Sequence, residues 1–137
     1  MVIDFIFQTI RQQALGNSTL NGFIAGRVFP QRADLESDTN QYPSIAYSLV
    51  GGFPDIDSYE SDVLLLEVMY ISDNSVDECY KIYNLFNTTI NKQRFKEAGS
   101  NRFFSVKEDS KPIDASGVFG NNILYIFSNT YAIRTIG

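Results

Sequence analysis

The sequence predicts an α+β fold, in which a mainly antiparallel sheet of four or more strands carries two helices packed on one face. Two segments show helical spacing of apolar residues, and four apolar runs have the length of strands, in the order helix, two strands, helix, two strands. The 137 residues, 44% hydrophobic and 14% aromatic, are enough to bury a core without a disulfide or a metal. We therefore expect a single domain over residues 1–137.

The first helix is predicted at residues 2–15, because its apolar residues recur at steps of three and four. Residues 16–17 form a typical C-terminal stop. Ser18 is the expected cap of a second, short turn that ends at Gly26, and residues 28–30 are expected to be extended. The apolar face of the first helix consists of Ile3, Ile6, Phe7, Ile10 and Ala14.

A polar loop is predicted at residues 31–42, and a strand with one apolar face at 44–50. The pair Gly51-Gly52 ends this strand and lacks the lysine and the helix that a phosphate-binding loop requires. The next run, residues 63–71, is apolar on both faces apart from Glu67, which is typical of a central strand. Glu67 either pairs across an interface or points to solvent, and the sequence does not decide between the two.

The second helix is predicted at residues 75–92. Ser75 and Glu78 match a capping box, in which each side chain accepts a hydrogen bond from the backbone of the other. Asp77 and Lys81 are four residues apart and predict an ion pair worth about 0.3 kcal/mol. The expected buried face consists of Val76, Cys79, Ile82, Tyr83, Phe86 and Ile90.

Two further strands are predicted at residues 102–106 and 122–136, joined by a polar connection over residues 108–121. The last run alternates clearly, but its second face is mixed, which indicates partial cover. A sheet of this kind leaves open edges and partly apolar outer faces. We expect oligomerisation to cover them.

Composition removes several classes of function. The net charge is −5, there is no histidine, and there is one cysteine. Without histidine the chain has no Ser-His-Asp or Cys-His catalysis, no neutral-pH proton shuttle and no zinc site that uses imidazole. Cys79 falls on the expected buried face and is interpreted as a structural thiol. We expect no enzymatic activity and no cofactor.

The acidic stretch 55–62 comes nearest to a metal-binding motif. A calcium loop of the EF-hand type needs glycine at its sixth position and a bidentate glutamate at its twelfth. Counted from Asp55, these positions hold Glu60 and Leu66. A solvated acidic loop is therefore favoured, and we expect no metal site.

The acidic balance also argues against a dedicated nucleic-acid binder, whose affinity comes from clustered lysine and arginine. Lys92, Arg94 and Lys96 are interpreted instead as cations at the end of the second helix, where they complement its dipole. No window approaches the ~18–20 apolar residues that a membrane span needs, and the N-terminus lacks the pattern of a secretory signal. We expect folding in a cytoplasm and no membrane association.

Three local motifs stand out in this order of elements. They are Gly26-Arg27-Val28-Phe29-Pro30, Tyr42-Pro43-Ser44-Ile45-Ala46-Tyr47 at the start of the first long strand, and Tyr70-Ile71-Ser72 before the helix at Ser75. With the order of elements, they make the chain resemble the tail terminator (tail completion) proteins of long-tailed bacteriophages over residues 2–134. The segments 31–42 and 108–121 are insert-like departures from that family.

The resemblance implies a structural virion protein at the head-proximal end of the tail, assembled in the host cytoplasm. It would form a hexameric ring that caps the tail tube, stops its polymerisation and joins the head-completion (stopper) complex. Viral DNA would pass through an acidic lumen without specific binding. Glu67 is one candidate interface residue. Those that follow from the analogy are Asp55, Asp57, Tyr59, Glu60, Asp62, Glu108 and Asp109.

Two rival functions remain open at this point. A head–tail connector or stopper protein of the phage neck would share the ring and the acidic lumen. A free cytoplasmic ligand-binding domain or small catalytic α+β domain would share only the fold class.

Overall fold

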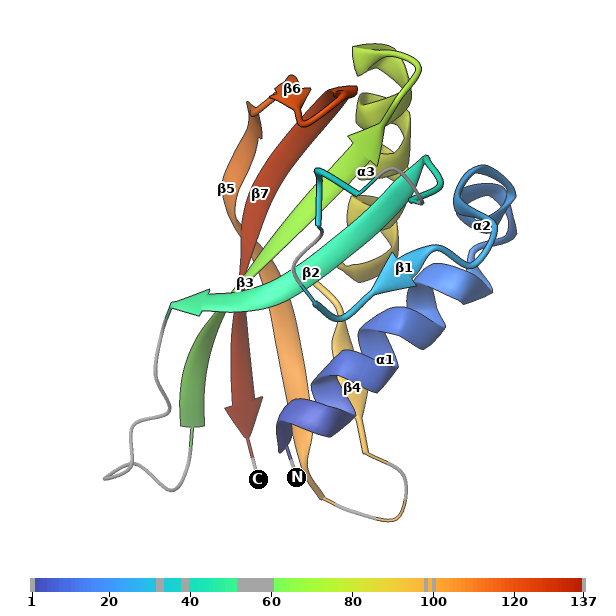
Figure 1. Ribbon diagram of the computed structural model, residues 1–137. Coiled ribbons are helices and arrows are strands. Elements are labelled where there is room, and N and C mark those ends of the chain that lie inside the picture. The colour runs from blue at the N-terminus through green and yellow to red at the C-terminus, as the bar shows by residue number, and fades with distance from the viewer. Residues whose placement is uncertain are drawn as a thin grey trace.

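The computed structural model describes residues 2–31, 34–37, 40–51, 61–97, 99 and 101–136. Within these ranges it contains three helices and seven strands (Figure 1). Their bounds are α1 Val2–Gly16, α2 Ser18–Ile24, β1 Val28–Phe29, β2 Ser44–Gly51, β3 Ser61–Ser72, α3 Val76–Ile90, β4 Arg94–Lys96, β5 Phe103–Asp114, β6 Gly117–Phe119 and β7 Asn122–Ile136. The predicted α+β class is confirmed.

The strands form one curled sheet in the order β1-β2-β3-β7-β5-β4, with β6 paired to β7 (Figure 1). β1 and β2 are parallel, with Val28 opposite Ile45, and the other pairings of the described strands are antiparallel. The sheet is therefore mixed, and there are three helices where two were expected. β3 lies between β2 and β7, as its apolar character predicted.

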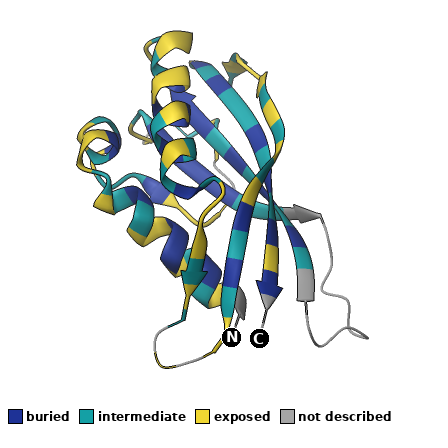
Figure 2. Cartoon of the chain, turned by 180° about the vertical axis from the view of Figure 1, so that it is seen from behind, coloured by how far each residue is buried: buried dark blue, intermediate teal, exposed yellow. Residues whose placement is uncertain are grey.

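The main core lies between the helices and one face of the sheet. The inward sides of α1, α2 and α3 pack there against alternate residues of β2, β3, β5 and β7, while their outward sides are exposed (Figure 2). The largest fully buried side chains include Tyr47, Tyr70, Tyr131, Phe86 and Phe104. We call this the helix face of the sheet and the opposite one the outer face.

β7 contributes to cores on both faces. Near its C-terminus Tyr131 and Ile133 belong to the helix-face core. Near its N-terminus Leu124 and Ile126 belong to a second cluster with Ile71, against which Leu35, Tyr42, Met69 and Phe119 pack. The prediction of partial cover on the second face of this strand is confirmed, since loop residues and β6 cover only one end of it.

The predicted polar connection over residues 108–121 is wrong. β5 continues to Asp114, β6 follows at Gly117–Phe119, and only a short turn then precedes β7. The register of β5 against β7 shifts between Glu108 and Ser110 and again between Ser110 and Ile113. This segment is a strand because β7 supplies its pairing partner, although its own residues lack the apolar alternation that marks a strand.

The helix starts differ in detail from the predictions. α2 is capped by Asn17, whose Oδ1 accepts from the Leu20 backbone N–H at 3.1 Å, where Ser18 was expected. At α3 the Ser75 hydroxyl accepts from the Glu78 N–H at 3.1 Å, as a capping box requires. The reciprocal bond is replaced, since the Glu78 carboxylate accepts from the Ser72 hydroxyl at 2.6 Å.

Two further expectations about α3 need correction. Val76 was placed on the buried face but is exposed, while the other five predicted residues are buried. Arg94 and Lys96 do not cap the helix dipole, because α3 ends at Ile90 and these residues form β4 at the edge of the sheet. The predicted Asp77–Lys81 ion pair is present at 3.1 Å.

Candidate functional site

The predicted interface residues divide into two groups. Asp55, Asp57, Tyr59 and Glu60 lie outside the described residues. Asp62 belongs to β3, with its backbone opposite Thr135 of β7. The remaining three, Glu67, Glu108 and Asp109, lie within strands near the middle of the sheet.

Glu67 and Asp109 meet on the outer face around Thr130 of β7. Glu67 is directly opposite Thr130 in the ladder between β3 and β7. From the other side, Asp109 Oδ2 accepts a hydrogen bond from Thr130 Oγ1 at 3.2 Å. Glu67 is half-buried, and none of the ion pairs among the described residues includes it. Two carboxylates predicted to lie at an interface thus share one part of the sheet that none of the described helices covers.

Glu108 points to the helix face, away from its neighbour Asp109. Its side chain is only 6% exposed. Its carboxylate accepts hydrogen bonds from the Tyr83 hydroxyl, from Asn129 Nδ2 at 2.9 Å and from Lys111 Nζ at 2.9 Å. The prediction that Glu108 lies in a connecting loop is wrong, and its carboxylate is already engaged by partners within the chain.

A chain of hydrogen bonds extends from Glu108 through the core. The Tyr70 hydroxyl donates to Asn129 Oδ1 at 2.9 Å and lies 3.3 Å from the Tyr131 hydroxyl. Tyr131 in turn donates to Asn87 Oδ1 at 2.9 Å. The network joins α3 to β3, β5 and β7, and among the described residues no buried side-chain nitrogen or oxygen lacks a partner. We call it the Glu108 network.

Burial and hydrogen bonding shift the pKa values of several groups in this network. Burial disfavours the Glu108 anion, but hydrogen bonds from Tyr83, Lys111 and Asn129, with the Lys111 charge, hold the pKa of the carboxyl below its usual value. Burial raises the pKa of Tyr131 to about 12 and that of Tyr70 well above its usual range. These two phenols therefore stay protonated at neutral pH and donate to the amide oxygens of Asn129 and Asn87, while Tyr83 donates to the Glu108 carboxylate.

Cys79 is buried as predicted. Its thiol lies 3.0 Å from the carbonyl oxygen of Tyr125 in β7, and burial raises its pKa to about 11. A thiol with this pKa is almost entirely protonated at neutral pH, so it is a poor nucleophile. Its role is to pack α3 against the sheet.

A groove of about 590 Å³ lies between α1 and β4. Phe5, Gln8 and Gln12 of α1 line one wall, and Arg94 to Glu97 line the other. Among the described residues, no three Asp, Glu or Cys side chains gather as metal ligands. The groove offers amide, aromatic, cationic and carboxylate groups and the Thr9 hydroxyl.

Two surface features were missed by the sequence reasoning. Arg94, Lys96, Lys107 and Arg134 are all exposed on the outer side of β4, β5 and β7. Large apolar side chains are also exposed at Val118 and Ile123 of the β6–β7 hairpin and at Ile113 of β5. The i, i+2 spacing of Arg94 and Lys96 is the sequence signal that could have identified the first group as one face of a strand.

Comparison with known proteins adds no assignment. No protein-family model matches the chain, and no curated protein matches its sequence. None of the described helices is both long and apolar enough to cross a membrane. Function has to be inferred from the surfaces described above.

Proposed function

We propose that the chain is a tail terminator subunit of a long-tailed bacteriophage, which forms a hexameric ring on the end of the tail tube. The main support is that two separate motifs of the resemblance lie side by side. Arg27 Nε donates to the carbonyl oxygen of Pro43 at 3.0 Å, and Val28 pairs with Ile45. Residues that resemble the family in sequence thus form one structural unit at the start of the sheet.

The finer fold prediction, a two-layer arrangement with helices on one face, is part of this proposal. In this two-layer arrangement, no helix layer covers the outer face of β3, β7 and β5. On β3 the side chains of Val63, Leu65 and Met69 are half-buried on that face, beside Glu67. Such a surface suits contacts in a ring, where each subunit meets its neighbour through a different patch.

The exposed apolar residues at the far end of the sheet suit the axial contacts of a cap. Val118 and Ile123 are cross-strand neighbours in the β6–β7 hairpin, and both are exposed. Isolated exposed apolar residues need no explanation, but an exposed apolar pair across a hairpin suits a docking surface. In a terminator this hairpin would meet the tail tube or the head-completion complex.

An assembly experiment tests the proposal. Purified chain is added to tail-tube protein of the phage that encodes it, and tube growth is followed by electron microscopy. A terminator stops growth and leaves a ring at one end of each tube. Tubes that grow unchanged while the added chain stays monomeric in the mixture would overturn the proposal.

A gene deletion separates the terminator from the rival neck protein. Overlong tails in the deletion phage support the terminator. Tails of normal length that fail to join heads would support the connector or stopper function instead.

A further inference from the structure

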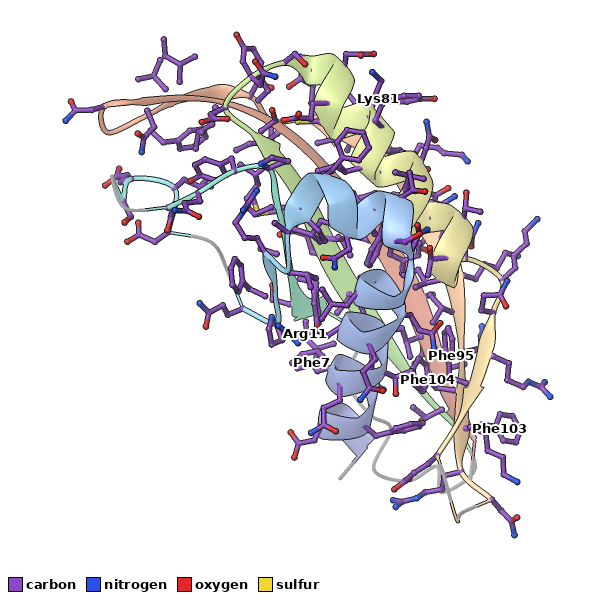
Figure 3. All side chains as sticks on the ribbon, turned by 90° about the vertical axis from the view of Figure 1, so that its right-hand side faces the viewer. Phe7, Arg11, Lys81, Phe95, Phe103 and Phe104 are labelled. Carbon is purple, nitrogen blue, oxygen red and sulfur yellow. The ribbon has the colours of Figure 1, made fainter. Side chains whose placement is uncertain are left out.

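The edge strand β4 presents two cations on the outer face. Arg94 and Lys96 are exposed, and the Arg94 guanidinium lies 4.6 Å from the centroid of the Phe103 ring. Phe95, between them in sequence, lies on the helix face, with its ring 5.3 Å from that of Phe104. Figure 3 shows Phe95 and Phe104 beside α1 and Phe103 on the far side of β4.

Two more cations extend this surface across the sheet. Ser105 pairs with both Arg94 and Arg134, which places the two arginines on one face, and Lys107 lies two residues further along β5. The ion pairs among the described residues are Asp77–Lys81, Glu97–Arg102 and Glu108–Lys111, so none includes these cations. We call Arg94, Lys96, Lys107 and Arg134 the basic patch. It stands out because the whole chain has a net charge of −5.

Along the sheet edge, β4 has backbone groups that no strand of the described part of the chain pairs with. The Glu97 N–H bonds to Arg102 O at 2.9 Å, and Gln93 O accepts from the Val106 N–H at 3.0 Å. Residues 93 and 97 thus face β5, and alternation in an antiparallel ladder turns the N–H and C=O groups of Arg94 and Lys96 outward. An added strand could pair with them, and the groove between β4 and α1 offers space alongside.

Two segments hold acids on either side of an apolar residue, 34–36 and 55–57. Leu35 of the first packs within its own chain against Ile71, Leu124 and Ile126, so the second is the candidate for this edge. Asp55 and Asp57 are two residues apart, as are Arg94 and Lys96, and Ile56 lies between them as Phe95 does. In an antiparallel pairing, each aspartate would face a cation, and Ile56 would fall on the side of Phe95 and the groove. Glu60 adds a further negative charge close by.

We propose that the basic patch and the free edge of β4 bind the acidic stretch 55–62 of a neighbouring copy, as the lateral contact of the ring. This inference rests on the proposed ring and names its contact surfaces. The acidic stretch connects β2 and β3, whereas β4 is the terminal strand beyond β7 and β5. The contact would thus join two different parts of the chain, as a head-to-tail contact requires.

Complementary charge reversal tests the contact. One variant carries R94E and K96E, and a second carries D55K and D57K. Each alone places like charges in the proposed contact, whereas an equal mixture restores opposite charges at every contact of an alternating ring. Sedimentation velocity then measures association of each variant alone and of the mixture, after circular dichroism has shown that both are folded.

The matched control is R11E/K81E, which changes the net charge by the same amount as R94E/K96E. Arg11 and Lys81 lie on α1 and α3, well away from Phe103 (Figure 3). We expect the complementary mixture to associate, with binding that weakens as salt rises, and R11E/K81E, which keeps both proposed surfaces, to associate on its own as the unmodified chain does. A complementary mixture that stays monomeric, as it would if each acidic stretch bound its own chain, would overturn the proposal, and so would a loss of association in R11E/K81E equal to that in R94E/K96E.

Failure of this contact is distinguishable from failure of the proposed function. If the complementary mixture associates but the unmodified chain does not stop tube growth, the contact holds and the terminator function is wrong. If the chain caps tubes but the mixture stays monomeric, the ring closes through other surfaces.

Discussion

The two faces of the sheet differ in how many hydrogen bonds their polar side chains form within the chain. Glu108 and Asp109 show this difference at adjacent positions. Glu108, on the helix face, accepts three side-chain hydrogen bonds. Asp109, on the outer face, is exposed and accepts a hydrogen bond from the Thr130 hydroxyl. A covered face must satisfy every polar group within the chain, whereas an uncovered face can leave its groups for water or a partner. Surfaces for assembly are therefore to be sought on the outer face.

The largest expected effect comes from the helix-face core. Replacement of the fully buried Phe86 by alanine should lower the free energy of unfolding by about 3–5 kcal/mol, because it removes apolar contacts and leaves a cavity. The half-buried, outer-face Leu65 is the matched comparison, and Leu65→Ala should cost the isolated chain clearly less. Chemical denaturation measures both. A loss below about 1 kcal/mol for Phe86→Ala would contradict the assigned core.

Replacement of neighbouring acids sharpens the comparison. Glu108→Ala leaves the Tyr83 hydroxyl and the Asn129 amide without their acceptor and should cost about 1–3 kcal/mol. Asp109→Ala removes an exposed acid and should change stability by no more than about 0.5 kcal/mol. Equal losses for the two variants in thermal or urea unfolding would show that the faces do not differ as described.

The pH dependence of stability should follow Glu108. Because its pKa is lower in the folded chain than in the unfolded one, its ionisation stabilises the fold above the unfolded pKa of about 4.3. That stabilisation is lost as pH falls through the folded pKa. The stability difference between the wild type and Glu108→Gln should stay constant from pH 7 to pH 5 and shrink below about pH 4. Urea unfolding at several pH values measures it, and a difference independent of pH would refute the assigned ionisation.

The smallest expected effect is at Glu67. Glu67→Gln should change the stability of the isolated chain by no more than about 0.5 kcal/mol, because no ion pair described here includes that carboxylate. A larger loss in denaturant unfolding of the isolated chain would mean that Glu67 has a structural partner, and that the outer face is less open than described.

The sequence predicted the elements whose signals are local. The helix at Ser75, the central strand around Glu67 and the final strand follow from capping and apolar periodicity, and all three are present. The strand character of residues 108–114 was missed, because it depends on pairing with β7 and its own residues are polar. The parallel pairing of β1 with β2 is likewise a tertiary contact without a local signal.

The candidate site was harder to predict than the fold. The acidic residues could be identified by composition, but nothing local indicates that Glu108 turns inward while Asp109 turns outward. That assignment depends on where the register shifts between Glu108 and Ser110. The basic patch was missed because its four residues come from three strands that are adjacent only after folding.

The buried thiol of Cys79 provides a natural reporter for the helix-face contact. It is the only cysteine, and its sulfur lies against the backbone of β7. A thiol reagent can reach it only when α3 moves away from the sheet, so the rate of labelling at constant pH measures how often that contact opens. Comparing this rate in the free chain and in an assembled ring would show whether assembly also steadies the helix layer, far from the surfaces that meet.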